Sequence, residues 1–195
     1  MTTETTTNTS ELPDYAPVPQ SALGPALNEQ GYYVGRVERN LYWITDCTYQ
    51  SAFLTTSDGV VLLDAPPTIG NNIQRAVDEI AAANGVSNKV THLVYSHHHA
   101  DHAGASSLFD KNVARIGHEE TRRLLLRDDD PARPPNEETF QDRRTLEIGG
   151  ERIDLAWHGA RCRAAVCGRQ ERSAYGRSPT RPRSSCAPRA SRSRC

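Results

Sequence analysis

The sequence predicts an α/β fold, and three observations support that prediction. Short segments rich in aromatic and β-branched residues alternate with amphipathic helix patterns between about residues 31 and 159. Turn residues separate these segments, and no apolar run is long enough to span a bilayer. On either side, residues 1–30 are polar and residues 160–195 are rich in Arg, Ser, Pro and Cys. One domain over residues 31–159 is therefore expected, with a flexible lead-in and a disordered tail.

The first half of the domain predicts antiparallel strands followed by a helix. Residues 41–45 and 51–56 have strand-type composition, and Ser57-Asp58-Gly59 is a turn sequence that leads into a strand over residues 60–64. Beyond it, apolar residues recur every three or four positions until a stop signal at Asn84-Gly85: Ile69, Ile73, Val77 and Ile80. This spacing predicts an amphipathic helix over residues 69–84 that buries one stripe against the sheet.

The second half continues the alternation. The expected elements are a strand over 90–95, a short helix over 103–109, a strand over 112–116 and a helix over 119–127. Asp128-Asp129-Asp130-Pro131 and Pro134-Pro135 predict a solvated loop, with residues 128–138 as a candidate rim of a site. Residues 145–148 and 152–157 are expected to pair as a hairpin across Gly149-Gly150.

A dense set of metal-ligand residues follows the strand expected over residues 90–95. His97, His99, Asp101 and His102 lie within six residues. In an extended segment residues two apart point the same way, so His97 and His99 can bind one cation while His98 points elsewhere. Asp101 and His102 can then project toward an adjacent position as the chain turns into a helix. Their oxygen and nitrogen ligands suit a second zinc ion, so a site for one or two ions is expected.

This segment resembles the HxHxDH signature of the metallo-β-lactamase superfamily: His97-x-His99-x-Asp101-His102, preceded by Leu93-Val94-Tyr95-Ser96. Asp64, at the end of its strand, is similar to the acid of the superfamily's first motif. The resemblance covers roughly residues 32–159. It implies an αβ/βα sandwich with zinc at one edge of two facing sheets. It also implies hydrolysis of an ester, amide, thioester or phosphodiester bond by a metal-bound hydroxide.

The resemblance implies a role for each residue. His97 and His99 would bind the first metal ion, and Asp101 and His102 the second. Asp101 would also be catalytic, orienting or deprotonating the attacking water. For Asp64 two interpretations stay open: an acid that orients the metal ligands, or a strand-end carboxylate that caps a turn.

The sequence departs from the family pattern after residue 159. The family supplies a further His after the strand expected at 152–157, and Cys162 stands where it would be. Cys162 and His158 are the two candidate substitute ligands, because no His or Asp follows Gly159. The fold is therefore expected to comprise the N-terminal half of the sandwich and part of the second. We interpret the chain as truncated or out of frame after about residue 159, which the coding DNA would test.

Charge and composition limit the classes of binding partner that the sequence favours. Residues 160–195 contain ten Arg and a single acid, Glu171, but almost no aromatic residues for base stacking, so nucleic-acid binding is not favoured. With no membrane segment and no signal peptide, a cytoplasmic protein acting on a small-molecule substrate is expected. An inner sheet face left uncovered by the missing half predicts self-association.

Three functions remain open from the sequence. The first is a zinc hydrolase of the metallo-β-lactamase type. The second is an inactive truncated fragment of such an enzyme, which retains the His97–His102 loop but lacks the later ligands. The third is an iron-dependent oxidoreductase on the same scaffold, because two His and one carboxylate also suit non-haem iron.

Overall fold

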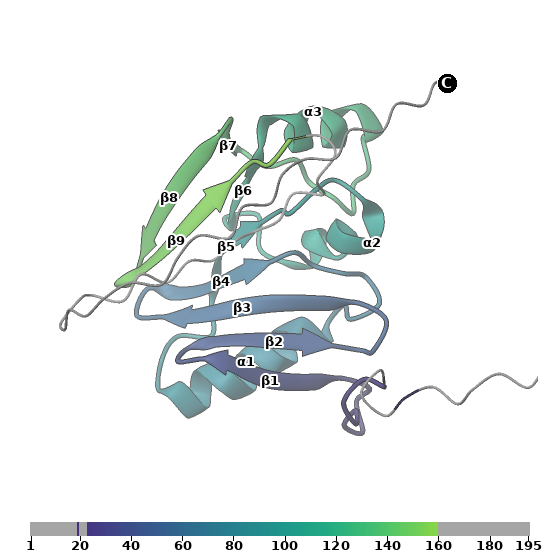
Figure 1. The fold of residues 1–195 in the computed structure, drawn as a ribbon, viewed down its shortest axis with the longest axis vertical. Coiled ribbons are helices and arrows are strands. Elements are labelled where there is room, and N and C mark those ends of the chain that lie inside the picture. The colour runs from purple at the N-terminus through teal and green to yellow at the C-terminus, as the bar shows by residue number, and fades with distance from the viewer. Residues whose placement is uncertain (1–18, 20–22, 160–195) are drawn as a thin grey trace, which may run out of the picture.

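The computed structural model describes residue 19 and residues 23–159. Within this part, seven strands form one mixed sheet in the order β1 to β7, and β8 and β9 pair separately as a hairpin (Figure 1). The strands of the sheet are β1 (Tyr33–Glu38), β2 (Leu41–Thr45), β3 (Gln50–Thr56), β4 (Gly59–Leu63), β5 (Val90–Val94), β6 (Ala114–His118) and β7 (Glu138–Phe140). The hairpin consists of β8 (Arg143–Ile148) and β9 (Glu151–Ala156).

Strand direction changes half-way across the sheet. Strands β1 to β4 are antiparallel neighbours, whereas β4 to β7 run parallel. Parallel neighbours need crossover connections, which here contain α1 (Asn72–Asn84), α2 (Ala100–Ala103), a 3₁₀ turn at Ser106–Leu108, and α3 (Glu119–Asp128). The carboxyl ends of β4, β5 and β6 therefore share one edge of the sheet.

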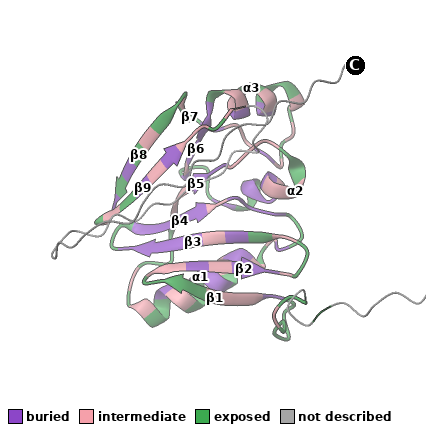
Figure 2. Ribbon diagram, in the orientation of Figure 1, coloured by how far each residue is buried: buried purple, intermediate pink, exposed green. Residues whose placement is uncertain are grey.

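Each face of the sheet carries its own apolar core. On the face covered by α1, Phe53 and Leu62 are fully buried with Ile73 of the helix. On the opposite face, the β8–β9 hairpin packs Leu146 and Ile153 against a second cluster that the sheet supplies: Leu54, Val61, Val94 and Ile116. Strand β4 is buried along almost its whole length, as expected for a strand covered on both sides (Figure 2). The architecture is thus an α/β arrangement with a sheet between helices and a second, smaller sheet.

Across residues 41–156 the predicted elements are confirmed in kind, with differences at their bounds and with one exception. The first long helix begins at Asn72 rather than at residue 69, because Ile69 and Gly70 form a turn that feeds it. The helix predicted over residues 103–109 is wrong: α2 ends at Ala103, and a separate 3₁₀ turn follows after Ala105 leaves helical geometry with φ −104° and ψ 10°. Strands β1 and β7 were not predicted.

Several expectations concern residues that the structure does not describe. The tail over residues 160–195, Cys162 included, lies outside the described residues, as does most of the lead-in over residues 1–30. Among the described residues, no helix combines the length and apolarity needed to cross a membrane. The domain boundaries at residues 30 and 159 stay predictions.

Gly59 begins β4 in a conformation that favours glycine. Its φ is +119°, and an added Cβ would lie 2.7 Å from both the Lys89 carbonyl oxygen and Thr91 Cγ2. Gly59→Ala is expected to lower the free energy of unfolding by at least about 2 kcal/mol, through backbone strain and collision with β5. Urea denaturation of the two proteins measures this difference.

Gly31→Ala is the matched control for this prediction. Gly31 also has a positive φ, +81°, but open space surrounds its Cβ position. It should therefore lose only the strain component and be the milder change. Equal losses in the two variants would show that contact with β5 contributes nothing at Gly59.

Candidate metal centre

The candidate site lies at the edge of the sheet where β4 and β5 end. Leu63 pairs with Val94 in parallel register, so the residues that follow these two strands emerge side by side. The Asp64 amide donates to the Val94 carbonyl over 2.9 Å. One residue later, the Ala65 amide donates to the His102 carbonyl over 2.8 Å. The end of β4 is therefore attached to both ends of the His-rich loop.

A sharp turn at His99 folds that loop back on itself. His99 has extended backbone angles, φ −64° and ψ 146°, and its carbonyl accepts from the amides of His102 and Ala103. As a result the imidazole rings gather: the His97 centroid lies 4.7 Å from that of His99 and 4.4 Å from that of His102. The HxHxDH spacing thus concentrates imidazoles in one place.

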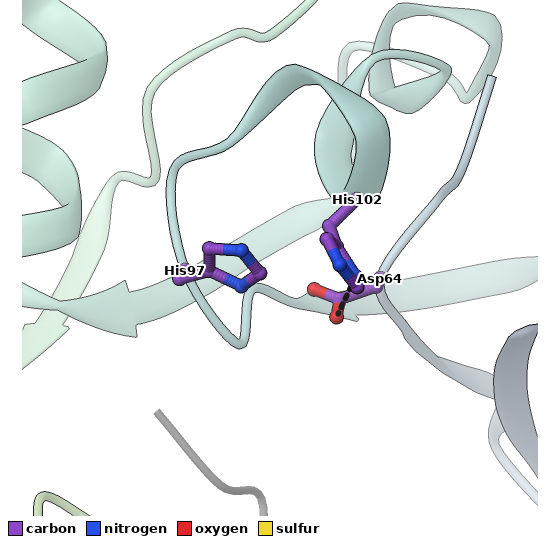
Figure 3. A group of neighbouring side chains, drawn as sticks. All are labelled: Asp64, His97 and His102. Atoms are coloured by element: carbon purple, nitrogen blue, oxygen red, sulfur yellow. Dashed lines mark ion pairs between the residues drawn. The ribbon is translucent and has the colours of Figure 1, made fainter. Parts of the chain in front are cut away.

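Three side chains come within reach of a single ion. Asp64, His97 and His102 each offer a ligand atom, and these atoms all lie within 4.8 Å of one another (Figure 3). Asp64 Oδ2 and His102 Nδ1 are 3.8 Å apart. A cation drawn in between them could replace these long contacts with ligand bonds of about 2.0–2.2 Å after small side-chain movements.

Asp64 has a buried carboxylate and an unusual backbone. Its φ of +62° is in the left-handed region, which Asp tolerates better than most residues. One carboxylate oxygen accepts the Ser96 amide over 2.7 Å, and the other accepts the Ser96 hydroxyl over 2.5 Å. Burial raises the pKa of Asp64 from its ordinary value to about 6, although these hydrogen bonds act in the opposite direction. Near neutral pH this site therefore holds a largely ionised carboxylate with little solvent around it.

His97 is kept neutral by its surroundings. Burial is the largest cause that lowers the pKa of His97 to about 4, and the neighbouring His102 and His99 act in the same direction. Its Nδ1 lies 2.9 Å from Ser96 Oγ, which also contacts Asp64. Since metal ligation requires a deprotonated imidazole nitrogen, no proton has to leave His97 at neutral pH. Imidazole nitrogens beside a buried carboxylate are donors that suit zinc, so the residues present fit that ion.

The other two predicted ligands lie beside this group. His99 adjoins His97, and Asp101 Oδ2 is 3.7 Å from His102 Nε2. The pKa of Asp101 lies below its ordinary value. Desolvation alone would raise this pKa, but a hydrogen bond with Tyr49 and the nearby His102 together lower it by more. The structure therefore brings all four residues of the motif to one place and adds Asp64. The division into one pair of ligands for each of two ions stays a prediction.

The two substitute ligands do not join the group in the part of the chain that is described. His158 is exposed after β9 and is absent from the set formed by Asp64, His97 and His102. Cys162 lies beyond the described residues. Among residues 23–159, His158 is therefore not part of the site.

Two residues that contact the motif were not expected from the sequence. Tyr49 packs its ring edge-on against His102, with centroids 5.6 Å apart. Arg133 is buried and donates to the His98 carbonyl, while its Nε lies 2.8 Å from Asp130 Oδ2. The Asp128–Pro135 segment is thus attached to the His-rich loop through Arg133. Both residues are far from the motif in sequence, and no spacing pattern marks them.

A model of a known protein family matches the part of the sequence that forms this site. The model described as the metallo-beta-lactamase superfamily matches residues 44–161, which is more than half of the chain. The chain belongs to the metallo-beta-lactamase superfamily. The match begins in β2 and includes Asp64 and the whole His-rich loop.

A curated relative shares part of this superfamily domain. The probable metallo-hydrolase YqjP of Bacillus subtilis (strain 168) is 33% identical over 66 residues, which is 34% of this chain and 21% of that protein. This chain therefore aligns with about a fifth of the length of that relative.

Solved metallo-beta-lactamases share the fold. IND-7 aligns with a TM-score of 0.53 at 22% identity, covering 67% of this chain and 62% of its own. LRA-12, a di-zinc class B3 enzyme from an Alaskan soil metagenome, aligns with a TM-score of 0.55 at 16% identity, covering 73% and 60%. The chain thus has the metallo-β-lactamase type of fold and spans about three fifths of the length of these two enzymes.

Proposed function

We propose that this protein is a zinc-dependent hydrolase of small molecules, which cleaves an ester, amide, thioester or phosphodiester bond with metal-activated water. The observation that carries the proposal is the convergence of Asp64, His97 and His102 at the sheet edge, with ligand atoms within 4.8 Å of one another. Membership of the metallo-beta-lactamase superfamily supports the same chemistry. One or two zinc ions would be held by this group together with His99 and Asp101.

Each residue would contribute in a way that its position favours. Zinc, when bound, supplies the acidification of water that makes a nucleophile available near neutral pH. Neutral His97 offers a nitrogen lone pair without first losing a proton. Asp101 is ionised and its side chain is 46% exposed, so it is accessible to water and substrate and suits the role of orienting the attacking water. Asp64 supplies a buried negative charge that attracts the cation.

Metal content and turnover together test the proposal. The purified chain would be supplied with zinc, dialysed, and assayed by elemental analysis alongside a variant carrying His97→Ala and His102→Ala. Both proteins would then be tested on a chromogenic lactam, a thioester and bis(4-nitrophenyl) phosphate. We expect one or two zinc ions per chain and turnover of at least one substrate, and neither property in the variant.

The outcomes separate hydrolase from inactive fragment. Zinc retention without turnover of any bond class would favour the inactive fragment, because this chain spans about three fifths of the solved enzymes it resembles. An empty protein that behaves like the double variant would overturn the metal site itself.

Iron is the second candidate ion, and a specific observation favours it. Asp64, His97 and His102 make up two imidazoles and one carboxylate, the set that non-haem iron centres use. The same elemental assay, carried out anaerobically with equal zinc and Fe²⁺, decides between them. Preferential iron retention in that assay, followed by oxygen consumption once air is admitted, would favour the oxidoreductase.

Two further expectations remain proposals. Self-association through an incompletely covered sheet face is testable by sedimentation velocity, in which a purely monomeric protein at all concentrations would contradict it. The cytoplasmic location expected from the sequence stays a prediction that fractionation would test.

A further inference from the structure

Tyr49 lies at the same edge of the sheet as the candidate metal site. It belongs to the connection between β2 and β3, residues 46–49. Strands β2 and β4 are both antiparallel to β3, so the carboxyl end of β2 and that of β4 lie at one edge. Figure 1 shows this connection on the side of the sheet from which α2 projects. A side chain from this connection can therefore reach the His-rich loop.

Local hydrogen bonds fix the backbone of Tyr49. Asp46 Oδ1 accepts the amides of Thr48 and Tyr49 over 2.9 and 2.7 Å, which makes a tight Asx-type turn. The Thr45 hydroxyl donates to the Tyr49 carbonyl over 2.7 Å and accepts the Cys47 amide over 2.9 Å. Both backbone polar groups of Tyr49 are thus held in place, and the ring extends from a rigid base.

The Tyr49 side chain contacts two residues of the metal-binding motif. Its ring meets that of His102 edge to face, at an interplanar angle of 87°. The Asp101 carboxylate, through hydrogen bonding and its negative charge, raises the pKa of the Tyr49 phenol above its ordinary value. The Asp101 side chain is 46% exposed, so little else restrains it. Its Oδ2 is 3.7 Å from His102 Nε2, which is longer than a hydrogen bond. The phenol therefore joins an exposed carboxylate to a half-buried imidazole.

We propose that Tyr49 is a positioning residue, which holds Asp101 and His102 in the orientation that binds the metal ion. The inference rests on the proposed metal site and adds a residue to it. A half-exposed carboxylate in the short helix α2 samples several rotamers, and ordering it on metal binding costs conformational entropy. A hydrogen bond from a rigidly held phenol reduces that cost before the ion arrives. Partners of this kind typically contribute about 10- to 100-fold to metal affinity.

Cobalt(II) titration of four proteins tests the role. The proteins are the wild type, Tyr49→Phe, Asp101→Ala and the double variant, with affinity measured by absorbance in competition with a chelator. Tyr49→Phe removes one oxygen and keeps the ring against His102. We expect its Kd for cobalt to rise about 10- to 100-fold, and we expect little further effect of Tyr49→Phe once Asp101 is replaced by alanine, which has no acceptor for the phenol.

Tyr33→Phe is the matched control. Tyr33 lies on β1 with its ring 5.5 Å from that of Trp43, and its replacement should leave cobalt affinity unchanged. Thermal unfolding of the metal-free proteins should give the same Tm for wild type and Tyr49→Phe within a few degrees. A fall in Tm that fully accounts for the lost affinity would assign Tyr49 a merely structural role and overturn the proposal.

The remaining outcomes distinguish the two levels of inference. If the wild type binds no cobalt, the proposed metal site fails and the role of Tyr49 fails with it. If the wild type binds cobalt and Tyr49→Phe binds it equally well, only the role of Tyr49 is overturned. An equal loss of affinity in the Asp101→Ala background would also overturn it, because the effect would not pass through Asp101.

Discussion

His97→Ala is expected to eliminate zinc binding at micromolar protein concentrations. His97 is the member of the group that adjoins both His99 and His102, with ring centroids 4.7 and 4.4 Å away, and it belongs to the set that reaches a single ion. The loss of affinity should exceed the about 10- to 100-fold that follows removal of a ligand's hydrogen-bond partner. Isothermal titration with zinc, after treatment with a chelator, measures it.

His98→Ala is the matched control for that experiment. It removes an imidazole one position away, from a residue that is absent from the three-residue group among the described side chains. Its backbone carbonyl, which accepts from Arg133, is kept in the variant. We expect zinc affinity within about threefold of the wild type, far less than the effect of losing a ligand. Equal losses at His97 and His98 would mean that the loop binds zinc nonspecifically.

Asp64→Asn is expected to change how the stability of the metal-free protein depends on pH. Burial raises the pKa of Asp64 from 3.8 to about 6, so the folded protein binds a proton more tightly than the unfolded chain. The stability linked to this proton is fully present below pH 3.8 and is lost as pH rises through 6. At about 1.4 kcal/mol per unit of pKa, the loss is about 3 kcal/mol. Asn does not titrate, so Asp64→Asn should gain stability relative to the wild type over this interval.

His97 acts in the opposite direction over nearly the same interval. Its pKa falls from 6.5 to about 4 in the folded protein, chiefly through burial. The stability linked to neutral His97 is present above pH 6.5 and is lost as pH falls through 4. The two contributions therefore oppose each other in the wild type, and His97→Gln should lose stability relative to the wild type as pH rises.

Urea denaturation between pH 4 and pH 7.5, with a chelator present, measures both effects. The wild type should show a shallow profile from this pair, with Asp64→Asn and His97→Gln diverging from it in opposite directions. Parallel profiles for all three proteins would contradict the coupling of burial and charge at this site.

Much of the fold could be predicted because its signals are local. The aromatic and β-branched composition of residues 41–45 and 51–56 predicted strands, and the three-to-four spacing after Ile69 reflects burial of one helix face. Each gave an element of the right kind. Strand β1 escaped prediction because Gly35 and Arg36 interrupt its apolar pattern, as an edge strand permits. Strand β7 has three residues, too few to establish any period.

The residues of the candidate site also fall into two groups, those that a local motif predicts and those that only the topology brings together. The motif from His97 to His102 is local, and its turn at His99 brings together residues that the sequence already grouped. Asp64 reaches them through the parallel register of β4 and β5, which pairs residues 31 positions apart in the chain, such as Leu63 and Val94. Tyr49 lies near the motif because β2 runs toward the same edge of the sheet. Arg133 lies near it because the loop after α3 returns to that edge. Contacts of that kind depend on topology, and residue spacing alone does not encode them.

The left-handed backbone at Asp64 restricts which residues can replace it. With φ at +62°, side chains branched at Cβ are strained there before any chemistry is considered, and only Gly, Asn and Asp adopt this region readily. Glutamate would keep the charge yet carry a backbone penalty along with its extra methylene. A mutational library at this position should therefore collapse onto a few residues even when it is selected for folding alone. The backbone conformation and the need for a negative charge would then restrict this position independently. A selection for folding in the absence of metal would reveal the backbone restriction alone.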